Sequence, residues 1–523
     1  MVLARLKSKP SDRSSRTLAH RKQGAAVFMV GVVTVIGLTS LLMGLDWQGY
    51  TAQPIAFLGS KAMVAVQGPE PSFVATGYAF PPLLVYGSAL MRSPVTLQVF
   101  SGALLVGLEI WQMGKLRVAR FWQILWTMLI LLHPAFGFML LREPVWVITA
   151  VLLWIVLQLM WQLIEPDNDL PISFLIVLMG LTFSGLQLLR FEAWLGLILL
   201  LVILWWLLLT ETWQYRVAAL FLVGTMNLFA IGTCLYLNWL ATDDPLAFLY
   251  QPGSGLRLPG LDSFWVQAGV GEGILKTMSL IVQIAPIYGL LMVWLLWQTQ
   301  SHVAVGLLFS LPVALMVITL WQGLYTPNLS QFGVYLALVP LLLAHLPSLQ
   351  SWRKLLITLG LGISLLCSGW FLQQNQVIPD EIVLWRQLTR QALPELQSVQ
   401  QFQQQAIEQR EIAAYLFQAK QPQQHILLDD GLHFPMMYFL HYTEGLILPH
   451  QYEFQVALEH PEERVDFIVI TGGRSPLRTQ DRVRRLLTQQ ENLDPESEEA
   501  LTVQGFNTVL NSPYYQVLQR QTS

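Results

Sequence analysis

Long apolar runs recur along this chain, and they limit it to a membrane-spanning architecture. Residues 25–45 (AAVFMVGVVTVIGLTSLLMGL) form an uncharged run of about the length that crosses a bilayer once. Further runs of roughly 17–25 residues follow, which predicts about eleven transmembrane helices. The runs lie near 25–45, 94–113, 119–135, 144–164, 171–189, 193–210, 216–240, 278–298, 303–324, 330–347 and 354–373. The predicted fold class is therefore an α-helical polytopic membrane protein.

Composition agrees with this class and excludes others. Only 12% of the residues are charged and 54% are hydrophobic, whereas soluble domains carry about 25% charged residues. The formal net charge of -3 gives no basis for a nucleic-acid partner. Both cysteines, Cys234 and Cys367, lie inside apolar runs, so they are predicted to be small buried hydrophobes rather than a disulfide or metal framework.

Lysine and arginine predict the orientation. The first 24 residues hold seven basic residues, and such a segment stays in the cytoplasm. The first apolar run is too long for the core of a cleavable signal peptide, so it is predicted to be a retained span. An odd number of spans then places everything after residue 374 on the outer side, and it puts the basic clusters at 115–120 and 353–354 inside.

Composition changes abruptly near residue 374, which predicts three parts. Residues 1–24 form a basic cytoplasmic tail, residues 25–373 a transmembrane region with outer loops 46–93 and 241–277, and residues 374–523 an extracytoplasmic domain. In the last part, helical patterns precede short strand-like runs. The helical patterns cover 380–393 and 398–419, and the strand-like runs are 426–428, 446–448 and 465–470. This alternation predicts a small α/β domain with a partly parallel sheet.

Carboxylates at predicted span ends are the first functional candidates, because charge near membrane depth is costly. Asp46 opens the first outer loop, Glu143 follows His133-Pro134 in the second, and Glu192 lies at a tight outer turn. A pocket lined by these three acids would supply a catalytic base that deprotonates an acceptor hydroxyl while a phosphate leaving group departs. The alternative for each acid is a solvated or snorkelling charge at a span end.

Cations on the same predicted face could bind that phosphate. Arg142, Arg190 and Lys276 offer charge-assisted hydrogen bonds. Residues 51–66 predict a helix that either lies flat on the membrane as a wall of the pocket or is an ordinary loop helix. The following Phe80-Pro81-Pro82-Leu83 turn breaks helix geometry, so it is predicted to re-enter the membrane edge.

An acid pair marks a second candidate site. Asp429 and Asp430 follow the strand-like run 426–428, and ligands bind at the carboxyl ends of strands in open α/β sheets. The functional interpretation is contact with the acceptor or the donor headgroup. The alternative is that the pair caps the helix predicted to begin near His433.

Short motifs also follow one another in a recognisable order over most of residues 25–373. They are Asp46 after the first span, the loop helix, the aromatic-Pro-Pro-Leu turn at 80–83, His133-Pro134, the turn Leu189-Arg190-Phe191-Glu192-Ala193-Trp194, Tyr325-Thr326-Pro327-Asn328, and Val339-Pro340-Leu341. In this layout the chain resembles the GT-C superfamily of integral membrane glycosyltransferases, whose sugar donors are dolichyl or polyprenyl phosphates. The outer C-terminal domain fits the same resemblance.

The resemblance implies inverting transfer of a sugar from a polyprenyl-phosphate-linked donor to a glycan, lipid or protein acceptor. The reaction would use a carboxylate base on the outer face of a bacterial inner or plasma membrane. His133 and Tyr78 join the substrate-binding candidates, and no resident metal or cofactor is expected, although a divalent cation stays open. Two positions depart from the pattern. Trp47 follows Asp46 where many members carry a second acid, and Gln331 stands near the usual late-loop arginine.

These departures leave two alternatives to a glycosyltransferase. The first is a non-catalytic GT-C-like subunit or scaffold, whose apolar outer faces would contact partner membrane subunits. The second is a transporter for a lipid-linked substrate. Transporters are commonly built from paired halves with matching broken helices, and the sequence shows no such internal repeat.

Overall fold

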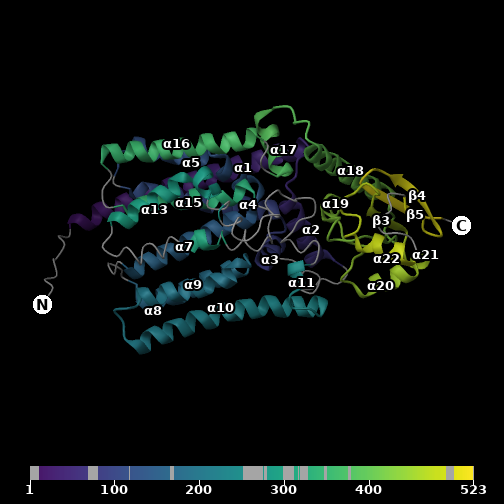
Figure 1. Cartoon of the computed structure of the whole chain (residues 1–523), viewed down its shortest axis with the longest axis horizontal. Coiled ribbons are helices and arrows are strands. Elements are labelled where there is room, and N and C mark those ends of the chain that lie inside the picture. Colours follow the sequence, from purple (N-terminus) through teal and green to yellow (C-terminus); the bar gives the residue numbers. More distant parts are fainter. Residues whose placement is uncertain are drawn as a thin grey trace.

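A computed structural model of the chain describes residues 11–68, 81–116, 118–164, 170–250, 275, 279–298, 311–315, 317, 328–346, 350–374, 378–490 and 500–521. Long helices run side by side along the longest axis of the molecule (Figure 1). The N-terminus lies at one end of this bundle, and a small sheet carrying the C-terminus lies beyond the other end (Figure 1).

Ten of the eleven predicted apolar runs appear as helices of the bundle, and most of the run 303–324 lies outside the described residues. These helices are α1 (Ser11–Trp47), α4 (Pro94–Lys115), α5 (Arg120–Leu131), α7 (Pro144–Ile164), α8 (Ile172–Gln187), α9 (Glu192–Leu207), α10 (Trp213–Thr242), α13 (Pro286–Gln298), α15 (Leu329–Ala344) and α16 (Ser351–Gln373), and the short α6 (Pro134–Arg142) follows α5. Among the described residues, five helices are long and apolar enough to cross a membrane, or six if the bent pair α5–α6 is one span. The chain is thus an integral membrane protein, and the number of crossings stays a prediction.

The segment after His133-Pro134 differs from the sequence prediction, which placed an outer loop there. The structure has a second helix, α6, bent by 61° from α5. Pro134 has no N–H to continue α5, but its fixed φ suits the first turn of a new helix. His133 caps that helix, because its Nδ1 accepts a hydrogen bond of 3.2 Å from the backbone N–H of Ala135.

Helix α15 forms the centre of the bundle. Every residue from Leu329 to Leu343 is buried, as expected for a helix that is almost entirely apolar around its circumference. It approaches α6 closely at Gly333, where a Cβ atom would lie 2.7 Å from the carbonyl oxygen of Ala135. A residue larger than glycine would therefore force these two helices apart.

Shorter helices join the bundle to the sheet. They are α2 (Gln53–Gln67), α3 (Pro82–Leu90), α11 (Ala247–Tyr250), α17 (Pro379–Thr389) and α18 (Gln397–Ala419). The predicted loop helix is present as α2, but it does not lie with one face open to lipid. Almost all of its residues from Pro54 to Val64 are buried, Lys61 included, because α2 packs between the bundle and α19 (Phe434–Leu440).

The C-terminal sheet has five strands in the order β2-β1-β3-β5-β4. They are β1 (Ile426–Leu427), β2 (Leu446–Ile447), β3 (Phe467–Thr471), β4 (Phe506–Asn511) and β5 (Tyr515–Arg520). Strand β1 pairs in parallel with β2 and β3, whereas β5 is antiparallel to β3 and β4. The prediction of a partly parallel sheet is confirmed, and the β4–β5 hairpin adds two strands that the sequence analysis did not include.

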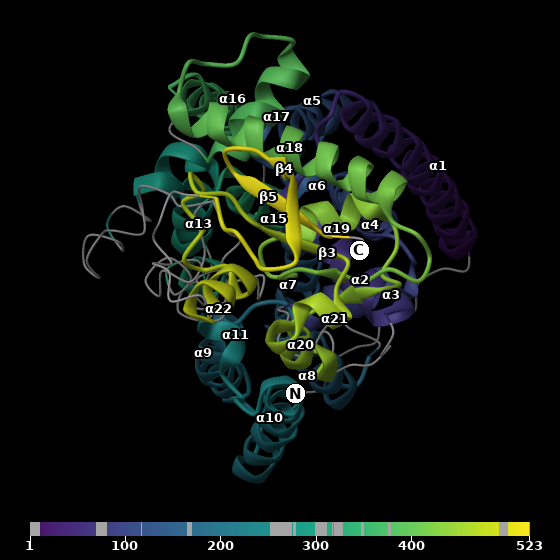
Figure 2. The same ribbon diagram turned by 90° about the vertical axis from the view of Figure 1, so that its right-hand side faces the viewer.

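Helices cover both faces of this sheet, as the alternation of side chains requires. Phe467 and Val469 pack with α18 and α19 on one face. Ile468 and Ile470 pack with α20 (Tyr452–Glu459) and α22 (Arg482–Gln490) on the other, and the short α21 (Pro461–Arg464) leads into β3. Figure 2 shows the sheet end-on, with α18 above it and α20 below.

Candidate functional site

Asp46 lies at the end of α1 and is accessible. Its carboxylate Oδ1 accepts hydrogen bonds from Thr51 Oγ1 at 2.8 Å and from the Arg410 guanidinium at 3.2 Å. The side chain is nevertheless 64% exposed. The neighbouring Trp47 is 93% exposed, and tryptophan favours the level of the lipid headgroups. Asp46 is therefore a carboxylate held in one orientation where the apolar part of α1 ends.

A small pocket of about 110 Å³ opens beside Asp46. It is built by α1, α2, α4, α6 and α19, so both the bundle and the sheet region contribute to it. The lining residues are Leu42, Met43, Leu45, Asp46, Tyr50, Thr51, Ala52, Ile55, Val95, Leu141 and Tyr438. Burial and the charge of Asp46 raise the pKa of Tyr438, and Arg410 opposes this. Tyr438 thus lies within electrostatic reach of the Asp46 carboxylate.

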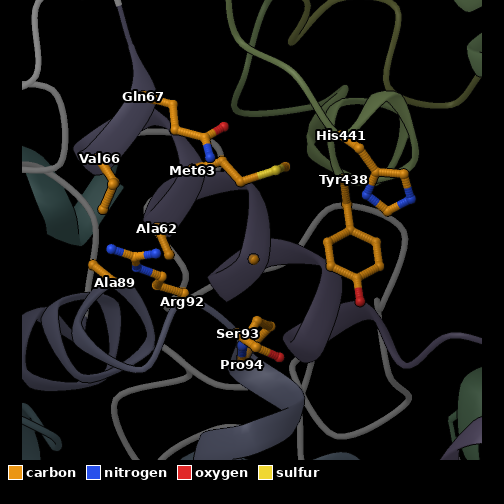
Figure 3. Close-up of a pocket in the computed structure, with 11 residues that line it drawn as sticks. Ala62, Met63, Val66, Gln67, Ala89, Arg92, Ser93, Pro94, Tyr438 and His441 are labelled. Carbon is orange, nitrogen blue, oxygen red and sulfur yellow. The ribbon is translucent and has the colours of Figure 1, made fainter.

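Tyr438 also lines a second, larger pocket of about 490 Å³. Figure 3 shows residues of α2, the α3–α4 turn and α19 around this space. The tyrosine ring fits against Gly59 of α2, where a Cβ atom would lie 2.4 Å from Cδ2 of the ring. The position of Tyr438 between the two pockets therefore depends on the absence of a side chain at residue 59.

Glu143 does not share the pocket of Asp46. It belongs to a buried ion cluster around Arg142, whose Nη1 lies 2.8 Å from Glu143 Oε1. Asp380 Oδ2 lies 2.6 Å from the guanidinium and Glu381 Oε1 lies 3.6 Å from it. Asn328 donates a further hydrogen bond of 3.2 Å to Glu143. The four charged side chains of this Arg142 cluster are at most 8% exposed.

The Arg142 cluster fixes α17 to the bundle. Glu381 accepts hydrogen bonds from the backbone N–H groups of Leu329 at 2.9 Å and Ser330 at 3.0 Å. These are the first N–H groups of α15, which have no partner within their own helix. Burial raises the pKa of Glu381, although Arg142 and these hydrogen bonds oppose the shift. The cluster therefore acts as a helix cap and a tie between segments.

Glu192 is also buried in an ion pair, with Arg190. The Arg190 guanidinium lies 3.7 Å from the centroid of the Trp146 ring. Of the described residues that line the pocket of Asp46, none other is acidic. The prediction that Asp46, Glu143 and Glu192 line one pocket is therefore wrong. Arg142 and Arg190, which were expected to bind phosphate, instead pair with Glu143 and Glu192.

The remaining candidates from the bundle fall in different places. His133 is 1% exposed and lies in the bend between α5 and α6, with its Nε2 at 3.3 Å from Ser368 Oγ. It lines neither of the two pockets that share Tyr438. Tyr78 and Lys276 lie outside the described residues.

Asp429 and Asp430 lie at the carboxyl ends of the parallel strands, but both are buried. Asp430 forms an ion pair with Lys61 of α2. Asp429 accepts backbone hydrogen bonds from Gly431 at 2.9 Å and Arg482 at 3.0 Å. Burial and the nearby Asp481 and Asp430 raise the pKa of Asp429 to about 6. In this structure the acid pair anchors α2 and the start of α22 to the sheet.

Sequence reasoning missed four residues that the fold brings to this region: Arg92, Arg410, Tyr438 and His441. Arg92 carries a local signal, since it directly precedes the Ser-Pro start of α4. Arg410 lies on α18, Tyr438 lies on α19 and His441 directly follows α19. No local pattern in one sequence relates these segments to the end of α1.

The chain is similar in structure to solved proteins, although no match was found by sequence. No family model matches the sequence, and no curated protein matches it. Among the solved structures to which the chain is similar is the single-particle cryo-EM structure of the arabinofuranosyltransferase AftD from Mycobacteria. The two are 13% identical, with a TM-score of 0.38. The match covers 95% of this chain and 40% of AftD, so the chain spans less than half of that protein's length.

Proposed function

We propose that this protein is a membrane glycosyltransferase that moves a sugar from a lipid-phosphate-linked donor to an acceptor hydroxyl, with Asp46 as the general base. The observation that carries the proposal is the environment of Asp46. A catalytic base needs a fixed orientation and access to its substrate. Thr51 and Arg410 orient this carboxylate, and 64% of its side chain stays exposed beside a pocket.

The surroundings of α1 support a lipid-linked donor. An apolar groove of about 590 Å³ runs between α1 and α4. Its described lining is Gly31, Val32, Val35, Ile36, Phe100, Ala103, Leu104, Gly107, Leu108 and Trp111. The same two helices contribute Asp46 and Val95 to the small pocket. A lipid chain in the groove would therefore hold its headgroup near the level of Asp46.

The distribution of charge supports an outer-face reaction. Helix α4 begins beside α2, near the sheet, and its other end carries Lys115. Helix α16 ends near α17, and its first turn, at the opposite end, carries Arg353. Both cations therefore lie at the end of the bundle opposite to the sheet. Basic residues favour the cytoplasmic side, so we assign Asp46 and the sheet to the extracytoplasmic side.

One observation favours a second candidate, a non-catalytic subunit of GT-C-like fold. Glu143 and Glu192 are both engaged in buried ion pairs, so Asp46 would act without either of the two partner acids that the sequence predicted. A scaffold would keep the buried clusters and need no reactive carboxylate. The substitution Asp46→Asn distinguishes the two candidates.

The experiment follows sugar transfer by the purified full-length protein in proteoliposomes, with a panel of radiolabelled polyprenyl-phosphate sugars and envelope glycans as acceptors. Loss of a general base lowers rates by about 10²–10⁴-fold, and we expect a decrease of this size in Asp46→Asn. The control is Asp243→Asn at the end of α10, an exposed acid whose φ of 58° asparagine also tolerates. Wild-type turnover in Asp46→Asn would exclude Asp46 as the base, and an inactive wild-type protein would favour the scaffold.

A further inference from the structure

The Arg142 cluster holds more negative than positive charge. Among the described residues it joins one cation, Arg142, to three carboxyl groups, those of Glu143, Asp380 and Glu381. If all four groups were ionised, one positive and three negative charges would give a net charge of -2. Surplus charge that is removed from water is costly, because no partner compensates it. A cluster of this composition therefore favours the binding of a proton.

Two of the three acids are well supplied with hydrogen-bond donors. Asp380 Oδ2 accepts a bond of 2.6 Å from Nε of Arg142. Glu381 accepts bonds from the backbone N–H groups of Leu329 and Ser330 and from the Ser330 hydroxyl. Donors of this kind favour the ionised form of a carboxylic acid. The hydrogen bonds therefore leave Glu143 as the acid that holds the proton.

Glu143 differs from the other two acids in contacts and in cover. The hydrogen bond that it accepts from Asn328, at 3.2 Å, ends on Oε1, the same oxygen that lies 2.8 Å from Arg142 Nη1. Its side chain is 8% exposed, whereas those of Asp380 and Glu381 are completely covered. Glu143 thus lies at the edge of the cluster, where a proton can enter and leave most directly.

The electrostatics around Glu143 agree with this assignment. Burial raises the pKa of Glu143, and so do the charges of Asp380 and Glu381. Arg142 and Arg190 lower it, and the resulting pKa is about 7, above the ordinary value of 4.5. The folded protein therefore binds this proton more tightly than the unfolded chain. The stability that the proton contributes is present at acidic pH and is lost as the pH rises through about 7.

Two connections lead from the cluster to the pocket of Asp46. Helix α17 carries Asp380 and Glu381 and continues into α18, whose Arg410 orients the Asp46 carboxylate. Tyr50 lines the pocket itself. Burial raises the pKa of Tyr50, and the charge of Asp380 adds to this shift, so Tyr50 lies within electrostatic reach of the cluster. A shift of α17 would therefore reach the surroundings of Asp46.

We propose that the Arg142 cluster is a proton-sensitive switch, in which protonated Glu143 keeps α17 on the bundle and loss of this proton loosens the helix. The Glu143 carboxyl group releases one proton to water and gains a negative charge. That charge repels Asp380 and Glu381, which lie on α17. The proposal does not depend on sugar transfer, because it concerns the contact between α17 and the bundle.

Hydrogen–deuterium exchange of the purified full-length protein in detergent tests the switch. The protection of the backbone amides of residues 378–389 is compared at about pH 6 and about pH 8.5, after correction for the intrinsic pH dependence of exchange. Below its pKa, one bound proton shifts an opening equilibrium about tenfold per pH unit. We therefore expect protection to decrease about tenfold between the two pH values. Equal protection at both would overturn the proposal without any variant.

The variant Glu143→Gln assigns the effect to one side chain. Glutamine is a neutral isostere of protonated glutamate, so its protection of α17 at about pH 8.5 should equal that of the wild type at about pH 6. Glu395→Gln is the matched control, because Glu395 is an exposed acid shortly after α17, and it should keep the full pH dependence. Glu143→Asp keeps a titratable carboxyl group and should also respond to pH. A wild-type response in Glu143→Gln would overturn the role of Glu143.

Discussion

Two charged regions connect the helical bundle to the segments that follow it, and they differ in access to solvent. The Arg142 cluster is fully covered, with Asp380 and Glu381 of α17 against one guanidinium. The contact between Asp46 and Arg410 of α18 is open, since the two side chains are 64% and 31% exposed. Both contacts join α17–α18 to the bundle, but one is locked in place and the other stays available to a ligand.

This difference separates the carboxylates that solvent can reach from those that it cannot. In the Arg142 cluster, each acid pairs with the Arg142 guanidinium, and Glu381 also accepts hydrogen bonds from the first backbone N–H groups of α15. These carboxylates therefore stabilise the fold. At Asp46, water and a substrate can reach the carboxylate. Asp46, Glu143 and Glu192 all lie at the end of an apolar run. They differ in burial, because Glu143 and Glu192 are buried and Asp46 is exposed.

The largest expected effect comes from breaking the covered region with Arg142→Met. Removing one partner of a buried ion pair costs about 3–5 kcal/mol, and here three carboxylates would lose the same cation. We expect loss of the folded protein in detergent or a large decrease in its apparent melting temperature, followed by tryptophan fluorescence. Arg142→Lys, which keeps the charge but loses the planar donor geometry, should fall between Arg142→Met and wild type. A melting temperature of Arg142→Met equal to that of wild type would contradict the role of the cluster.

The sequence predicted the bundle well because hydropathy is a local property. The observed α4, α7 and α10 lie within a few residues of the runs at 94–113, 144–164 and 216–240. The prediction was wrong after His133-Pro134, where the sequence analysis placed a loop and the structure has the helix α6. A proline can mark either the end of a helix or the first position of a new one, and the local composition does not distinguish the two. The sequence analysis did not include the strands β4 and β5. In β4 most residues are exposed, so its pattern of apolar residues is weak.

The candidate site was less predictable than the fold because its pairings are long-range. Arg142 was assigned to phosphate from its place near a span end. Asp380, which neutralises it together with Glu381, lies 238 residues further along the chain. The same holds for Tyr438 beside Asp46. A single sequence gives no signal for such pairs, whereas Asp46 could be identified from local features alone.

An intermediate effect is expected where the sheet docks on α2. Lys61 and Asp430 form a buried ion pair. On the same helix, the Phe57 ring packs edge-to-face against the Phe434 ring, with 5.5 Å between the ring centroids. Lys61→Met leaves Asp430 buried without its cation, which should lower the free energy of unfolding by about 3 kcal/mol. In Lys61→Met/Asp430→Leu, an apolar pair replaces the ion pair, and most of the stability should return.

A double-mutant cycle checks this interpretation, with Asp430→Leu as the fourth corner. We expect a coupling free energy of about 1–3 kcal/mol between the two positions. If the double variant is as unstable as the sum of the two single variants, Lys61 and Asp430 contribute independently, and the sheet is held on α2 by the apolar contacts rather than by this pair.

The smallest effect on stability is expected in the open region, from Arg410→Ala. Exposed ion pairs contribute about 0–1 kcal/mol, so the melting temperature should hardly change. Arg410 orients the Asp46 carboxylate together with Thr51, and under the proposed function it is a positioning residue. We therefore expect kcat for sugar transfer to fall about tenfold with little change in KM, and Arg410→Lys to restore part of it. Arg485→Ala, on the exposed side of α22, is the control for loss of a surface cation. If Arg410→Ala lowered stability as Arg142→Met does and left kcat unchanged, the two regions would have the same structural role, and access to solvent would no longer distinguish a reactive carboxylate from a structural one.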